Sequence, residues 1–399
     1  MTKHSWQFVP KFRRNGFGWQ SDKPIHRIKE AVAEIRKVAR NDPILAAEGA
    51  LVFIEKVSAS LMGVDSSSGA LSEHLNAAIE ALSKIISAAP AKPAERRLWL
   101  KRLWQAVEDD EMPYLEYLLD FWGELCADPM LASEWANEFF PQLEFISDPR
   151  NQDAPFYRWT TACFSALLAA HRYEEILELV SRPTFKWWDN RRWGVRSLVA
   201  QGKWAEAIHL AIDQPSRSDP PDAIARACEA ILLAEGLVEE AYVRFALKAN
   251  DSSTYLARFR AIAKKYPSIE PAVILGDLVA EDPSLSGKWF AAAKDAGLYD
   301  LAIELVSNSP ADPRTLTRAA RDYRRTQPRF ALAAGLAALR WMAADYGYEI
   351  TGEDILEAYR EVLATAPLAG ADPRQVKLQI QAWTSGASRI EKRMREVLA

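Results

Sequence analysis

A short pattern of residues recurs six times in the second half of the chain, and this repeat restricts the possible folds more than any other feature. Each copy begins with Gly, Pro or His and continues with an aromatic or branched residue two positions later; five copies have Ala three positions after that. The copies begin at residues 171, 202, 236, 267, 297 and 328, so successive copies are 30 to 34 residues apart. Each copy lies between two segments of helical periodicity, and we interpret it as the turn of a helical hairpin.

The residue types suit such a turn. Gly or Pro ends the preceding helix, the aromatic residue packs between the two helices, and Ala allows the second helix to approach its neighbour closely. The sequence has no alternating run of Val, Ile and Thr that would indicate a strand, and it carries Asp-Pro pairs that favour helix starts. We therefore predict an all-α fold: an α-solenoid of antiparallel helical hairpins with a period of about 31 residues, and a helical N-terminal half. The Asp-Pro pairs lie at 42–43, 128–129, 219–220, 282–283, 312–313 and 372–373.

The turns resemble those of tetratricopeptide repeats, whose second helix opens with a similar Gly-x-Tyr-x-x-Ala element. The resemblance covers roughly residues 155–345, and it implies an α-solenoid that binds other macromolecules. Most copies are 30 or 31 residues apart rather than the family's 34, so we do not transfer the family's concave binding residues to this chain. The best matches are Gly202-Lys203-Trp204-Ala205-Glu206-Ala207 and Gly297-Leu298-Tyr299-Asp300-Leu301-Ala302.

The first 150 residues do not follow the repeat. We expect a flexible basic and aromatic arm at residues 1–23, a helical N-terminal region at 24–150, tetratricopeptide-like repeats at 151–350 and a helical C-terminal cap at 351–399. The sequence leaves open whether 24–150 continues the stack of hairpins or forms a separate helical domain. The helices expected in this region lie near 24–40, 43–61, 70–89, 93–109, 113–126 and 128–139.

Signatures of catalysis, metal binding and membrane insertion are missing from the sequence. It contains no phosphate-binding or dinucleotide-binding glycine motif and no His-Glu-x-x-His, and its five histidines are far apart. The three cysteines do not form a Cys-x-x-Cys pair, which indicates a reducing compartment rather than a disulfide framework. The longest apolar run, 331–339, is too short to span a bilayer. We expect a cytoplasmic protein with no catalytic activity, no cofactor, no metal and no membrane partner.

The N-terminal arm has the composition of a surface that binds single-stranded nucleic acid. Residues 1–40 carry ten Lys and Arg against three acids, and five aromatic residues lie among the first of these charges. Basic side chains neutralise phosphates and aromatic faces stack on bases, but the same aromatics would also dock the arm against the first helices. The candidate nucleic-acid contacts are Lys11, Arg13, Arg14, Phe17 and Trp19, with Arg314, Arg318, Arg321 and Arg325 at helical spacing as a second basic stripe.

Two further segments predict contacts with protein partners. The segment 185–193 is rich in Trp and Arg, the residue types that dominate interface hot spots. We expect Trp188 and Trp193 in the core and Lys186, Trp187, Arg191 and Arg192 on the surface. The segment 103–149 holds twelve acids and no Lys or Arg, so its acidic face can receive a basic partner, the chain's own arm, or the arm of a second copy in a self-associated form.

Together these features favour an interaction scaffold. The favoured function is the binding of a protein partner in the groove of the repeats, with the 186–193 residues in contact. The alternative is nucleic-acid binding through the arm and the arginine stripe.

Overall fold

The computed structural model describes residues 4–151, 157–213, 218–383, 392 and 394–396. Within these residues the secondary structure is entirely helical, which confirms the predicted all-α fold. Two compact units divide the chain, residues 1–220 and 221–399, and helices within each unit pack against their successors in a manner compatible with an α-solenoid. Parts of the predicted repeat segment and of the predicted C-terminal cap lie outside the described residues.

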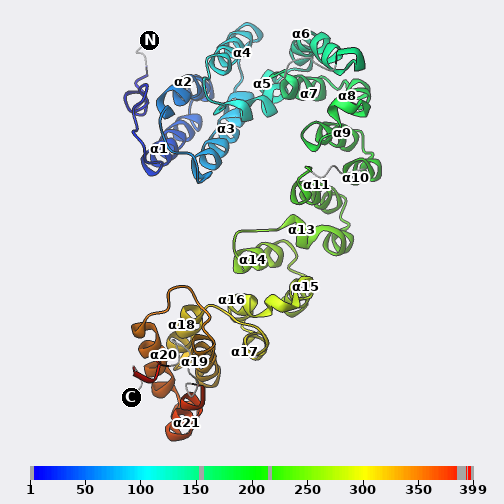
Figure 1. The fold of residues 1–399 in the computed structure, drawn as a ribbon. Helices are drawn as coiled ribbons and strands as arrows, with labels where there is room; N and C mark the ends of the chain where they lie inside the picture. Colours follow the sequence, from blue (N-terminus) through cyan, green and yellow to red (C-terminus); the bar gives the residue numbers. More distant parts are fainter. Residues whose placement is uncertain (1–3, 152–156, 214–217, 384–391, 393, 397–399) are drawn as a thin grey trace. The chain divides into compact units, whose positions relative to one another are not determined.

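In the N-terminal unit, the described residues form ten α-helices with short 3₁₀ turns between some of them (Figure 1). Its elements are η1 (Val9–Lys11), α1 (Asp22–Ala39), α2 (Pro43–Leu61), α3 (Ala70–Ala88), α4 (Pro93–Glu108), η2 (Glu116–Phe121), α5 (Trp122–Cys126), α6 (Pro129–Ser147), η3 (Pro149–Asn151), α7 (Thr160–Ala169), α8 (Tyr173–Ser181), η4 (Pro183–Phe185), α9 (Trp188–Ala200) and α10 (Trp204–Ile212).

Helices α1, α3, η2, α7 and α9 follow one another in one layer of this unit, and each contacts the next. Helices α2, α6, α8 and α10 each pack against one or two members of that layer (Figure 1). Packing continues across residue 150, because α6 lies against α7.

The predicted helices near 43–61, 70–89 and 93–109 are confirmed by α2, α3 and α4, but the helix predicted at 113–126 is wrong. A 3₁₀ segment, η2, and the short α5 take its place. Gly123 of α5 lies close to α7, where an added Cβ would be 2.1 Å from the Ser165 carbonyl oxygen. The helix predicted at 128–139 extends as α6 to Ser147, with Pro141 inside it.

The Asp-Pro pairs begin helices as predicted at most positions. Asp42 accepts the amide of Leu45 at 2.9 Å, and Asp128, Asp282 and Asp312 cap α6, η6 and α18 in the same way. Asp219 differs: its carboxylate accepts the amide of Trp188 and the guanidinium of Arg191, 28 residues earlier in the chain.

The C-terminal unit continues with the helices α11 to α21, and the described residues 392 and 394–396 after them are also helical (Figure 1). Tyr242–Ala246 forms a π-helical turn between two short α-helical segments. The elements are α11 (Pro221–Ala234), α12 (Val238–Ala241), η5 (Tyr242–Ala246), α13 (Leu247–Ala249), α14 (Tyr255–Lys265), α15 (Pro271–Glu281), η6 (Pro283–Trp289), α16 (Phe290–Asp295), α17 (Tyr299–Asn308), α18 (Pro313–Tyr323), α19 (Pro328–Ala343), α20 (Gly352–Thr365) and α21 (Pro373–Trp383).

Four of the six repeat copies share one backbone turn. His171, Gly202, Gly236 and Gly297 have φ between 59° and 75°, a conformation that Gly adopts without strain. The amide of the next residue then donates to the carbonyl five positions earlier, as in Arg172 to Leu167, which is the hydrogen bond of a Schellman cap.

The second helix of each of these four hairpins begins two residues after the turn. The residue at that start is half-buried at Tyr173, Trp204 and Tyr299 and exposed at Val238, so it does not fill the space between the helices as predicted. The residue three positions later, predicted to let the two helices approach closely, is fully buried in all four copies. Its exposure is 0% at Ala207, Ala241 and Ala302, and also at Ile176, which replaces Ala in the first copy.

The two Pro copies differ from the other four. In the copy that begins at Pro267, helix α15 starts only at Pro271, which leaves Ala272 exposed at its first turn. In the copy that begins at Pro328, that proline is itself the first residue of α19.

No helix in the described part of the chain is long and apolar enough to cross a bilayer.

Candidate binding groove

The predicted partner-binding residues at 186–193 do not form one surface. Lys186 and Trp187 are exposed at the start of α9, where the ammonium of Lys186 lies 5.7 Å from the centre of the Trp187 ring. Trp188 and Trp193 are buried, which confirms their predicted place in the core. Arg191 and Arg192 point to different sides of α9, because neighbours on a helix are about 100° apart.

The prediction that Arg191 lies on the surface is wrong. Its side chain is 7% exposed and forms an ion pair with Asp219, itself 2% exposed, at 2.9 Å. The same guanidinium donates to the carbonyls of Lys186 and Ala211, at 2.8 and 3.2 Å. Arg191 therefore connects α9 to α10 and to the segment before α11, and no donor face remains at the surface for a partner.

Arg192 is occupied by the acidic segment. Its guanidinium lies 2.5 Å from the carboxylate of Asp120 in η2, and the side chains are 22% and 12% exposed. Beside it, Arg196 lies 4.6 Å from the ring centre of Trp193, and burial of the guanidinium followed by repulsion from Arg192 lowers its pKa. A pocket of about 390 Å³ at this place is lined by both Arg192 and Arg196 and by carboxylates such as Glu124, so its charges largely balance.

The arm is docked rather than flexible, so the docking interpretation of its aromatic residues is confirmed. Trp6, Phe8, Phe12 and Phe17 are 1–8% exposed. The three Phe rings pack edge to face against one another or against Phe53 of α2, and Trp6 packs against Phe8 at a tilt. The predicted nucleic-acid contact Phe17 therefore has no free face. Trp19, with 72% of its surface exposed, is available.

The arm's cations are mostly engaged by the chain itself. Lys11 pairs with Glu30 of α1 at 3.1 Å, and Arg14 pairs with Glu111 of the acidic segment at 2.9 Å. Arg13 donates to the carbonyl of Pro10 at 3.0 Å. The arm and the acidic segment thus meet within one molecule through an exposed pair.

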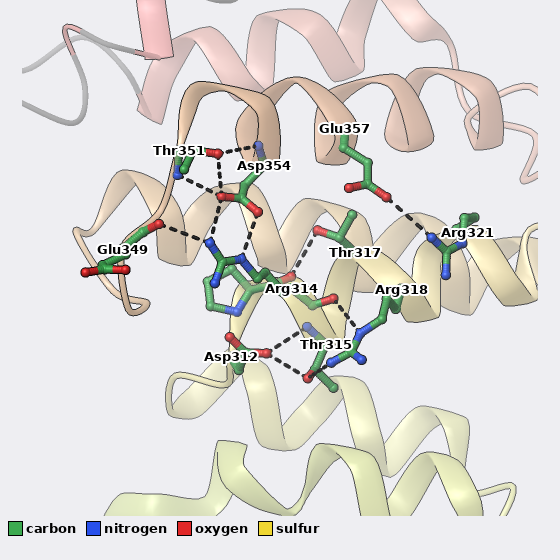
Figure 2. A network of polar contacts seen from close by, with 11 residues as sticks. Asp312, Arg314, Thr315, Thr317, Arg318, Arg321, Glu349, Thr351, Asp354 and Glu357 are labelled. Carbon is green, nitrogen blue, oxygen red and sulfur yellow. Dashed lines mark hydrogen bonds and ion pairs between the residues drawn. The ribbon is translucent and has the colours of Figure 1, made fainter.

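The arginine stripe of the C-terminal unit faces an acidic helix of the same unit. Figure 2 shows Arg314 of α18 donating twice to Asp354 of α20, at 2.8 and 3.0 Å, and once to the carbonyl of Glu349. Arg321 lies 3.5 Å from Glu357. These ion pairs join α18 to α20.

The stripe also ends earlier than predicted. Arg318 donates to Thr315 and to the carbonyl of Arg314 (Figure 2). Arg325 lies beyond the end of α18 at Tyr323, in the exposed turn before α19, so it does not share the helical face of the other three. Arg324 instead approaches α20, 3.2 Å from Glu361.

A groove between α1 and α3 differs from all of these surfaces in its charge. It has a volume of about 580 Å³ and is lined by Lys29, Arg36 and Lys37 of α1, by Arg40 at the C-cap of α1 and by His74 of α3, with no carboxylate among its lining residues. All four cations are exposed, and within the described part of the chain none of their side chains has an ion pair or a hydrogen bond. We call this feature the α1–α3 groove; apolar side chains complete it, namely Ile28, Val32, Ala33, Ala77 and Ala78.

The cations are free because the acids of α1 face the arm. Glu30 lies between Arg27 and Lys11, whose hydrogen bonds hold the pKa of its carboxylate at about 2. Glu34 accepts the backbone amides of Gln7 and Phe8. Docking of the arm thus engages both carboxylates in the middle of α1. The basic residues that line the groove are left without a carboxylate partner.

Sequence reasoning counted these four cations but did not identify them as a site. The signal lay in their spacing: at 100° per residue, Lys29, Arg36 and Arg40 fall within about 40° of one another on α1. Glu30 and Glu34 fall about 100–140° away from Lys29. In the same projection Lys37 lies about 80° from Lys29, on the side of Glu30, so spacing alone marks only three of the four cations as one stripe.

The described residues contain no comparable cluster of metal ligands. Within the described residues, no three His, Cys, Asp or Glu side chains are placed to hold an ion together. The three cysteines are unpaired and buried, and burial raises the pKa of Cys126 to about 12 and of Cys228 to about 11, so neither is an activated nucleophile.

His74 helps to define the polar edge of the α1–α3 groove. Its Nδ1 lies 2.8 Å from the carbonyl oxygen of Ala70, which accepts the hydrogen bond. This contact fixes the ring and leaves Nε2 as the ring atom available to a ligand.

Comparison of the chain with protein-family models, curated proteins and solved structures finds no match in any of the three.

Proposed function

We propose that the protein is a non-enzymatic interaction scaffold that binds an anionic macromolecular partner in the α1–α3 groove. The observation that carries the proposal is the set of four exposed cations that face one groove without a carboxylate. Elsewhere the candidate arginines Arg191, Arg192 and Arg314 already have carboxylate partners inside the chain.

Like charges so close together repel one another in the free protein, and an anionic partner would relieve that repulsion. The groove also lies on a layer of packed helices, so its walls are held by the core rather than by loops. Ile28, Val32 and Ala78, at its base, are 1%, 8% and 3% exposed. A partner would therefore meet a preformed surface, which limits the entropic cost of binding.

The test compares two variants of the full chain that change the net charge equally. In the groove variant, Lys29, Arg36, Lys37 and Arg40 are each replaced by Glu. In the control variant the same replacement is made at four exposed cations that lie outside the groove and lack side-chain partners among the described residues: Lys203, Lys264, Arg329 and Lys377.

Each form is used as bait in nuclease-treated lysate of the native host, and the captured proteins are identified by mass spectrometry. The proposal expects one or more proteins captured by the wild type and the control variant to be missing from the groove variant. Equal capture by all three baits, with circular dichroism showing intact helices, would rule out the groove as the binding surface.

Nucleic acid is the second candidate partner, because the same four cations would neutralise phosphates. Retention of an oligonucleotide by the wild type and control variant but not by the groove variant would favour it. Such binding would weaken steeply between about 50 and 200 mM salt.

A further inference from the structure

We propose that the occupant of the α1–α3 groove is an acidic amphipathic helix of a protein partner, with its apolar side chains on the groove floor and its carboxylates toward α1. This inference rests on the proposed function, because it names the class of partner for the same groove. It depends on the charge of the lining, the chemistry of the floor and the length of the basic stripe.

The lining combines positive charge with an aliphatic floor. Besides the cations and His74, the groove exposes Ala33 and Ala77 above the buried Ile28 and Val32, and no Phe, Tyr or Trp lines it. Proteins that bind single-stranded nucleic acid rely on aromatic side chains for base stacking. The aliphatic floor instead offers contacts for Leu, Ile or Val of a partner helix, as in helix-in-groove recognition.

Four of the five aromatic residues of the arm are not available to supply stacking. Trp6, Phe8, Phe12 and Phe17 are buried in the core against α2. Trp19 is exposed, but it does not line the groove. A nucleic acid in the groove would therefore be held mainly by its phosphates, and the apolar floor would remain unused.

The basic stripe matches about three turns of helix. Lys29 and Arg40 are eleven residues apart on α1, which corresponds to about 16 Å along the axis. A partner helix of about 11–15 residues lying along α1 would place acids at i, i+4, i+7 and i+11 within reach of the stripe. Its aliphatic residues at i+1, i+5 and i+8 would then face the floor, since they fall on a neighbouring stripe.

The probes are three fluorescent peptides and two oligonucleotides, titrated into the full-length protein and followed by anisotropy. One peptide carries Glu and Leu in the amphipathic pattern, the second has the same composition in scrambled order, and the third is polyglutamate of equal length. A 20-nucleotide single strand and a duplex of the same length complete the set. The proteins are the wild type, the groove variant, the control variant and Ala77→Phe, which fills the exposed floor and keeps every charge.

We expect the amphipathic peptide to bind the wild type and the control variant alike, and the groove variant at least about tenfold more weakly, since four exposed ion pairs together contribute about that factor. The scrambled peptide should bind the wild type several-fold more weakly than the amphipathic one. Ala77→Phe should weaken the amphipathic peptide and leave polyglutamate unchanged.

Three results would overturn the inference while the proposed function stands. The first is equal binding of the scrambled and amphipathic peptides, and the second is groove-dependent binding of either oligonucleotide that is tighter than that of any peptide. The third is a self-associated form, seen by sedimentation velocity, that only the groove variant lacks, because the occupant would then be a second copy. If no probe and no self-association depends on the groove, both proposals fail.

Discussion

Replacing Arg191 by Ala should destabilise the N-terminal unit strongly, although the sequence places this residue among the candidate surface contacts. The side chain is 7% exposed, and its guanidinium is 2.9 Å from the carboxylate of Asp219, which is 2% exposed. The substitution also removes the donors to the carbonyls of Lys186 and Ala211. The Asp219 carboxylate would then stay buried without its guanidinium.

The magnitude follows from burial. Removing one member of a buried ion pair costs about 3–5 kcal/mol, and for a unit of this size each kcal/mol corresponds to about 2–4 °C. The loss in Tm should therefore be about 6–20 °C. The matched control is Arg192→Ala on the next residue, whose partly exposed pair with Asp120 should contribute about 1 kcal/mol.

Differential scanning calorimetry of the full chain measures both variants, and Asp219→Asn completes a double-mutant cycle with Arg191→Met. We expect a coupling between the two positions, because each single change removes the ion pair and leaves the other group buried without its oppositely charged partner. The reasoning is refuted if Arg191→Ala lowers Tm no more than Arg192→Ala does. Arg191 would then be a surface residue after all, and a contact with a partner would again be possible.

Three other perturbations test the packing. Gly49→Ala in α2 should displace the arm and cost about 1–3 kcal/mol, since its Cβ would lie 2.2 Å from Cζ2 of Trp6. Quenching of tryptophan fluorescence reports the displacement, and Gly276→Ala, with nothing within 4 Å of its Cβ, should show none. Asp354→Asn should destabilise the C-terminal unit by about 2 kcal/mol, because the carboxylate caps α20 and accepts two hydrogen bonds from Arg314. The hydrogen bonds from Arg314 are the main reason that the pKa of Asp354 lies below its usual 3.8. The free energy of unfolding measured by urea titration should therefore be higher for the wild type than for Asp354→Asn by the full amount above about pH 5, and by less as the pH falls below 4. A difference that does not change with pH contradicts this. Finally, a thiol-specific disulfide reagent at pH 8 should label no cysteine in the folded protein and all three in denaturant, because Cys126, Cys163 and Cys228 are buried; rapid labelling of the folded form would show that one is accessible.

Local chemistry explains how much of the fold the sequence predicts. Helix starts and hairpin turns depend on residues within about five positions of one another, such as the Asp42 side chain with the Leu45 amide and Gly202 with its positive φ. The segment at 113–126, where the prediction failed, makes distant contacts instead. Asp110, just before it, contacts Ser58 of α2 and Arg158, and Gly123 lies against Ser165 of α7.

The candidate site was less accessible to sequence reasoning, because a Lys or Arg is available to a partner only if no carboxylate of the fold reaches it. Spacing along α1 was visible in the sequence, but the fate of each charge was not. Arg14 meets Glu111 across 97 residues, Arg192 meets Asp120 across 72 and Arg314 meets Asp354 across 40.

By itself, then, the sequence determined an all-helical chain of hairpins, since hydrophobic periodicity, caps and turns are short-range properties. Tertiary packing decided which aromatic residues are buried and which cations keep a free charge. It placed the arm on α1 and α2, engaged Glu30 and Glu34 there, and left the cations of the α1–α3 groove unopposed. Burial and ion pairing are sums over neighbours that are distant in the chain, and only the folded structure brings those neighbours together.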